Sequence, residues 1–233
     1  MKNPSCISHY CHIKAGSVSL NGKKLFERTS PDLSGFLKAA YQHFETDYPK
    51  FFKMDRLSKL AFMAVEVLLE AANASEKNRT TFQEMQKTSH TNQKPSQTPQ
   101  KISQENRDMA IVRSHRASSL DTDRKYQESI SDLDNFYPSP AVFVYTLPNI
   151  CIGEISIRHR LRSENSFFIF EAFNPGFLKD YADSLLQHEK ADEVLCGWVD
   201  VDEDAYEAFL YIVSRTGSYP HTEQQLTELY LTP

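Results

Sequence analysis

The sequence predicts an α/β protein in which a mixed, mainly parallel sheet is flanked by helices. Short apolar runs alternate with helical segments of about a dozen residues between positions 109 and 215. A wide apolar stripe at helical spacing marks a buried helix over 56–72. The pair Asn21-Gly22 lies between two short runs of β character, as in a hairpin turn. With 233 residues, 40% of them hydrophobic, the chain can bury a core of this kind.

The amino-terminal elements follow from local patterns. Residues 6–13 have β character, and 17–26 read as a hairpin centred on Asn-Gly. The apolar spacing of 34–44 and 56–72 predicts two helices, the second of which begins after Asp55 as its N-cap.

A polar segment separates the two halves of the chain. Of the 34 residues from 74 to 107, 18 are Gln, Thr, Ser or Asn, so this stretch cannot offset its ordering entropy by burial. We therefore expect a dispensable loop or disordered insert. It carries a net charge of +3, which leaves −8 on the rest of the chain.

The carboxy-terminal half predicts strands and helices in alternation. We expect strands at 109–114, 167–170, 192–201 and 206–215, and helices at 124–130, 150–161 and 175–188. The residues after Gly217 are expected to form a terminal arm.

Composition excludes several functions. The net charge is −5 and the sequence pI is near 5.9, so no basic field exists to hold nucleic acid or an anionic membrane. No apolar run approaches the length of a membrane span, and the polar start lacks a signal core, so we expect a cytoplasmic protein.

The numbers and spacings of the cysteines and glycines also argue against several kinds of binding site. Four scattered cysteines without a CxxC pair argue against a disulfide framework or a structural zinc site, and predict reduced, mostly buried thiols. The 7 glycines form no GxGxxG or GxxxxGK[ST] loop, so we expect no nucleotide cofactor. The acidic run at 200–204 lacks the spacing of a calcium loop and reads as a solvated turn, so we expect no metal.

Three blocks resemble the amino-terminal half of the β-ketoacyl-acyl-carrier-protein synthases. Residues 54–71 carry the family's M-D-R-x-x-x-x-A helix pattern, and 109–123 match the following strand and loop. Residues 147–200 match the stretch that runs from a buried helix, through a turn at 160–165, to the strand at 191–200. The resemblance implies half of a thiolase-like fold.

That resemblance implies one synthase amino-terminal-like domain over 1–233, interrupted by the polar insert at 74–107. The family's chemistry needs a cysteine thiolate where a strand turns into a helix, because the helix N-terminus lowers the thiol pKa. Counting back without gaps from Ala191 places Ala172 at that position, so no catalytic residue occupies the elbow. The synthase histidines belong to the other half of the family's proteins and correspond to no residue here.

Synthase-like subunits that lack the cysteine are the chain-length factors of bacterial polyketide and aryl polyene pathways, and the sequence looks most like a short form of these. The resemblance implies pairing with an active ketosynthase or a second copy, and an acyl carrier protein as a further partner. It also implies that the residues around the elbow line the dimer interface or acyl tunnel: Phe167, Phe168, Phe170, Ala172 and Phe173. A phenylalanine-rich strand is equally typical of an ordinary core.

Two alternatives stay open. Cys151 with His159 or His188 as base would make the chain a thiol acyltransferase active in its own right. A stand-alone acyl-binding scaffold is the other. Ser118, Ser119 and Asp121 lack a G-x-S-x-G elbow and read as helix capping rather than as a hydrolase site.

Overall fold

The computed structural model describes residues 4–30, 32–88, 107–132, 134 and 136–232. Within these ranges the strands form one eight-stranded sheet. The strands are β1 (Cys6–Lys14), β2 (Ser17–Leu20), β3 (Lys23–Glu27), β4 (Met109–His115), β5 (Asn165–Ile169), β6 (Glu193–Asp202), β7 (Ala205–Ser214) and β8 (Tyr219–Pro220). The helices are α1 (Leu33–His43), the 3-10 helix η1 (Pro49–Lys53), α2 (Arg56–Thr88), α3 (Leu120–Ser129), α4 (Pro140–Val144), α5 (Ile150–His159), α6 (Pro175–Gln187) and α7 (Glu223–Leu231).

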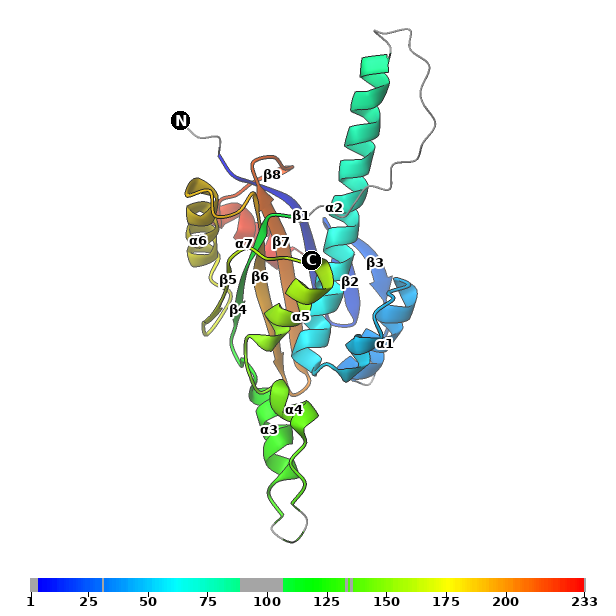
Figure 1. Cartoon of the computed structure of the whole chain (residues 1–233), viewed down its shortest axis with the longest axis vertical. Helices are drawn as coiled ribbons and strands as arrows, with labels where there is room; N and C mark the ends of the chain where they lie inside the picture. Colours follow the sequence, from blue (N-terminus) through cyan, green and yellow to red (C-terminus); the bar gives the residue numbers. More distant parts are fainter. Residues whose placement is uncertain (1–3, 31, 89–106, 133, 135, 233) are drawn as a thin grey trace.

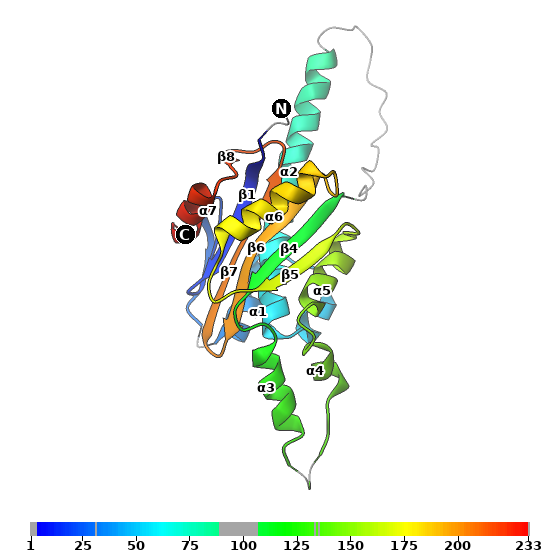
Figure 2. The ribbon, with the colours of Figure 1, turned by 90° about the vertical axis from the view of Figure 1, so that its left-hand side faces the viewer.

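Helices cover both faces of the sheet, as Figures 1 and 2 show. Helices α1, α2 and α5 lie on one face, and α6 and α7 lie on the other. Each face has its own hydrophobic core, because residues along a strand point alternately to the two sides. Helices α3 and α4 extend beyond one end of the sheet (Figure 1).

The sheet is mixed, as predicted, with the order β3-β2-β1-β7-β6-β4-β5 and β8 beside β1. Fewer strands pair in parallel than the predicted, mainly parallel sheet requires. Among the described strands, only β4 with β5 and β4 with β6 pair in parallel, against five antiparallel pairings. The reason is that β6 and β7 form a hairpin, since the turn after Asp202 is too short for a crossover helix.

The amino-terminal hairpin is confirmed. Asn21 and Gly22 have φ angles of 50° and 76°, which suits the two central residues of a type I′ turn. The turn also contacts β1, because Asn21 Oδ1 accepts a hydrogen bond from the Tyr10 backbone N–H at 2.9 Å.

Helix α2 begins where predicted but extends further. Asp55 Oδ1 accepts from the Ser58 backbone N–H at 2.9 Å, which confirms the N-cap, and the predicted apolar stripe is buried. The expected loop over 74–107 is wrong for 74–88, because α2 continues to Thr88. Residues 89–106 lie outside the described residues. No helix in the described part of the chain is long and apolar enough to cross a membrane.

The terminal arm is part of the fold, contrary to expectation. Strand β8 pairs with β1, and α7 buries Leu226 and Leu229 against the sheet. The buried ring of His221, just after β8, lies 2.9 Å from Asp183 of α6 through Nδ1. Lys179 Nζ approaches the other oxygen of Asp183 at 3.1 Å. The arm is therefore attached to α6 by a polar contact as well as by packing.

A second carboxylate fixes the other end of the arm. Tyr230 of α7 donates a 2.6 Å hydrogen bond to Glu207 of β7. His12 and Lys14 of β1 lie 3.0 and 2.8 Å from the same carboxylate. Although burial raises the pKa of Glu207, these hydrogen bonds lower it to about 2. Burial likewise raises the pKa of Asp183, and its hydrogen bonds lower it to about 2.

These two carboxylates predict acid sensitivity. A carboxyl group whose pKa is lower in the folded chain stabilises the fold above its unfolded pKa, and that stabilisation disappears as pH falls towards the folded pKa. We expect the free energy of unfolding to fall by roughly 3 kcal/mol between about pH 5 and pH 2, after allowance for partial solvent exposure. Urea unfolding across this range tests the sign. A double variant, Asp183→Asn with Glu207→Gln, should show a much flatter profile, and an unchanged profile would contradict the assignment.

Candidate functional site

The predicted elbow lies where the three mutually parallel strands end. Strand β5 ends at Ile169 and α6 begins at Pro175, so Ala172 lies in the turn between them, exposed to solvent. Asn174 caps α6 by accepting from the Phe177 backbone N–H at 3.0 Å. The carboxyl end of a parallel sheet, where β4 and β6 also finish, is the usual place for a ligand site in α/β proteins.

Helix α7 covers the start of α6. A Cβ atom added at Gly176 would lie 3.1 Å from Glu223 Oε2, so the carboxylate of Glu223 packs directly on the first turn of α6. A negative charge is favourable at a helix N-terminus. The ring of Phe173 lies 4.6 Å from that of Tyr230 and 5.5 Å from that of Phe209, between centroids. The elbow turn is thereby attached to the arm and to β7.

The structure does not bring the five predicted interface or tunnel residues onto one surface. Phe167 packs towards the α2 and α5 layer, with its ring 5.9 Å from that of His115. Phe168 packs on the opposite face against Phe177 and Tyr181 of α6, at 4.6 and 5.1 Å. Phe170 also packs against Phe177 of α6, and Phe173 packs against Tyr230 of α7. Ala172 is exposed in the turn.

Strand β5 is an edge of the sheet. It pairs with β4 alone in the strand order. The Phe170 backbone N–H donates to His115 O at 2.9 Å, and Ile111 N–H donates to Glu164 O at 2.9 Å. Backbone groups of alternate residues point the same way, so those of Phe167 and Ile169 face the open edge. The Ile169 side chain is 58% exposed.

The cysteines give no reactive thiol at the elbow. Cys151 is 2% exposed, and burial raises its pKa despite the nearby positive charge of Arg113. Burial also raises the pKa of Cys11 to about 12 and that of Cys196 further. Cys6 lies at the start of β1, level with the start of β6 and so at the opposite end of the strands from the elbow. All four are free thiols, as predicted.

The two histidines weighed as bases for Cys151 have other contacts. His159 Nε2 lies 2.9 Å from Glu66 of α2. His188 Nδ1 lies 2.8 Å from Ser184 O within α6. The structure therefore does not assemble the thiol and base that an acyltransferase would need.

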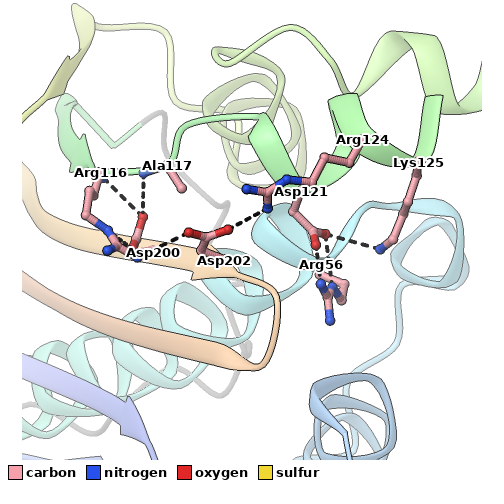
Figure 3. Close-up of polar contacts among 8 residues, drawn as sticks. All are labelled: Arg56, Arg116, Ala117, Asp121, Arg124, Lys125, Asp200 and Asp202. Carbon is pink, nitrogen blue, oxygen red and sulfur yellow. Dashed lines mark hydrogen bonds and ion pairs between the residues drawn. The ribbon is translucent and has the colours of Figure 1, made fainter. Parts of the chain in front are cut away.

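An ion-pair network holds the loop after β4, beside the elbow (Figure 3). Asp200 Oδ1 accepts from the backbone N–H groups of Arg116 and Ala117 at 3.1 and 2.9 Å, and the other oxygen accepts from Arg116 Nε at 3.1 Å. Asp202 accepts from Arg124 Nη1 at 2.6 Å. The acidic run thus serves to fix this loop, rather than forming only a solvated turn.

A second set of ion pairs connects α3 to α2, because the carboxylate of Asp121 contacts Arg56 and Lys125. Ser119 precedes α3, but its hydroxyl donates to Asp123 at 3.0 Å instead of capping the helix. No cluster of three or more His, Cys, Asp or Glu side chains arranged to hold a metal ion occurs in the described ranges.

Sequence reasoning missed Arg113 and His115, whose side chains are fully buried on the α2 and α5 side of β4. Arg113 Nη1 lies 2.6 Å from Cys151 Sγ. Burial, followed by the positive charge of Arg113, holds the pKa of His115 well below its ordinary value. The sequence feature that could have indicated these residues is an arginine that directly follows the apolar residues 109–112 within a predicted buried strand.

Together, the mixed sheet, the two helical layers and the strand-to-helix elbow define a ketosynthase-like α/β domain, which confirms the fold inferred from the sequence. The sequence matches no protein-family model and no curated protein. Solved structures do match, and their TM-scores place this chain in the fold of ketosynthases and chain length factors.

Three of these structures are informative. The ishigamide ketosynthase/chain length factor has a TM-score of 0.56 and 14% identity, over 91% of this chain and 62% of that chain. The ketosynthase ApeO in complex with its chain length factor ApeC, from Xenorhabdus doucetiae, has a TM-score of 0.53 and 13% identity, over 98% of this chain and 91% of that chain. AntDE:AntF, a type II polyketide synthase acyl-carrier protein in complex with its ketosynthase bound to the hexaketide, has a TM-score of 0.51 and 11% identity, over 91% and 62%. The chain thus spans less than two thirds of the first and third.

Proposed function

We propose that this chain is a non-catalytic, synthase-like subunit of the chain-length-factor type, a single cytoplasmic domain that pairs with an active β-ketoacyl synthase. The observation that supports it best is an elbow without a nucleophile beside an open, apolar strand edge. The similar structures support the same idea, because one is a ketosynthase with its chain length factor and another is a ketosynthase complex with an acyl carrier protein.

The elbow supports a non-catalytic role in two ways. Ala172 has no group that can attack a thioester, and each thiol buried in the core is held in its neutral form by burial. In addition, the carboxylate of Glu223 packs on the first turn of α6, where a developing oxyanion would need free positive potential.

The edge of β5 supports pairing. An unpaired strand edge with exposed apolar side chains favours addition of another strand. The outward backbone groups of Phe167 and Ile169 would bond to the partner strand, and Ile169 would pack beside it. We propose that Phe168 and Phe170 support this edge from the α6 side, and that Ala172, exposed in the adjoining turn, contacts the partner. Phe167 and Phe173 lie on opposite faces of the sheet, so they do not line one cavity.

We expect the purified chain to show no condensation with malonyl and acyl carrier-protein substrates. The variant Ala172→Cys should also be inactive alone, since restoring the thiol leaves Glu223 in place. The assay is release of carbon dioxide and formation of the β-ketoacyl product. The positive control is a complete ketosynthase from the same genome, assayed alone and with this chain, and we expect the mixture to form a stable complex.

Two results would contradict this proposal. Turnover by the chain alone that is lost in Cys151→Ala would make it a thiol acyltransferase. A monomer that binds acyl chains but forms no complex with any ketosynthase of its genome would make it a stand-alone scaffold.

A further inference from the structure

Arg113 is a buried cation with an open hydrogen-bonding edge. Its side chain is fully buried on β4, the strand next to the edge strand β5. Its Nε and Nη2 atoms have no hydrogen-bond partner among the residues that the structure describes. A guanidinium stays protonated in proteins, so it cannot avoid the cost of burial by losing its charge. An unpaired buried charge of this kind requires a counter-charge.

The neighbouring groups do not supply that counter-charge fully. Cys151 Sγ contacts Nη1, on the other side of the guanidinium, and burial favours its neutral thiol. Asp55 acts electrostatically on Cys151, and its two oxygens already accept from Ser58 N–H and Thr122 Oγ1 at 2.9 Å. Burial also raises the pKa of Asp55.

The helices increase the positive potential at this point. Cys151 is the second residue of α5, and its sulfur lies 3.9 Å from the carbonyl oxygen of Leu57, the second residue of α2. Two helix N-termini therefore meet near Arg113, and each favours negative charge. The neutral, buried ring of His115, two residues along the same face of β4, supplies no negative charge.

Two other arginines of this molecule use their Nε and Nη2 atoms to bind carboxylates. Arg158 donates from Nε and Nη2 to the two oxygens of Glu66, each at 3.1 Å. Arg56 uses Nε and Nη2 on the two oxygens of Asp121. This planar pair of donors fits two oxygen atoms held at carboxylate spacing. Arg113 has the same pair of donors without a protein acceptor.

We propose that the Nε and Nη2 edge of Arg113 is a buried binding site for a small carboxylate of the size of formate or acetate. The carboxylate would take the two donors that no described residue occupies and would neutralise the guanidinium. The site is internal and does not depend on pairing with a ketosynthase, so this inference stands apart from the proposed function.

The test uses thermal unfolding of the full chain at constant ionic strength, with sodium acetate replacing sodium chloride. A ligand that binds the folded chain raises the melting temperature saturably. We expect an increase of about 5 to 10 °C at about a hundred times Kd. Acetamide, which has the shape of acetate without its charge, should give no such increase. Equal melting temperatures in acetate and chloride would overturn the proposal.

The variant Arg113→Met should lose the dependence of the melting temperature on acetate. The variant Arg158→Met should keep it, because the Nε and Nη2 donors of Arg158 are already bound to Glu66 in the wild type. If Arg113→Met keeps the dependence, the effect is an adventitious additive only and the proposal fails. If Arg113→Met does not fold, wild-type chain is refolded from urea with carbon-13 formate, and one protein-bound formate signal after dialysis supports the site. Absence of that signal overturns it.

Discussion

The substitution Ile169→Lys should weaken the complex with a ketosynthase at least about a hundredfold, which corresponds to roughly 2.8 kcal/mol. Ile169 lies on the last position of β5, at the free edge of the sheet, with its side chain 58% exposed. A lysine at a strand edge opposes pairing, because the ammonium group would be desolvated by the incoming strand. The isolated chain should change in stability by about 0.5 kcal/mol or less, because the side chain is outside both cores. Titration calorimetry with the purified ketosynthase measures the affinity.

Leu231→Lys is the matched control. Leu231 is 70% exposed at the end of α7, away from the β5 edge, so a lysine there should leave the affinity unchanged. Phe168→Lys is a poorer probe, because Phe168 packs against Phe177 and Tyr181 and a charge there should destabilise the chain itself. If Ile169→Lys is folded and binds the ketosynthase as tightly as the wild type, β5 is not the interface.

Gly197→Ala should destabilise the fold by about 4 kcal/mol or more. Gly197 has φ 149°, a conformation that residues with a side chain rarely adopt. A Cβ atom there would lie 2.1 Å from Phe209 O and 2.9 Å from Leu210 Cα. Strands β6 and β7 would have to separate at the centre of the sheet, where Gly197 pairs with both Arg113 and Leu210. Urea unfolding followed by circular dichroism measures the loss.

Gly153→Ala provides the opposite control. Gly153 lies inside α5, and a Cβ atom there meets nothing within 4 Å. Alanine should therefore stabilise the chain by about 0.5 to 1 kcal/mol through its better helix propensity. A Gly197→Ala variant within about 1 kcal/mol of the wild type would show that β6 and β7 can adjust, contrary to this interpretation.

Elements with strong local signals were predictable. The α2 start has a capping aspartate and a wide apolar stripe, and the β2–β3 hairpin has Asn-Gly at the two positions that need positive φ. The polar residues after position 73 suggested a loop because they cannot be buried, but α2 continues to Thr88. Helix propensity and continuation from a stable segment allow this, since extending an existing helix does not require a new nucleus. The arm was missed because β8 and α7 depend on partners distant in sequence.

For the candidate site, the local pattern of the sequence predicted an apolar strand at 167–170, and the resemblance to the synthases placed Ala172 at the elbow that follows it. Only the tertiary structure decided which helices Phe167 and Phe168 meet on the two faces of β5, and that Glu223 packs on α6. That Arg113 Nε and Nη2 lack a hydrogen-bond partner among the described residues could also be seen only in the folded structure. These features depend on which segments meet across the sheet, and sequence spacing carries no record of contacts made between residues far apart in the chain.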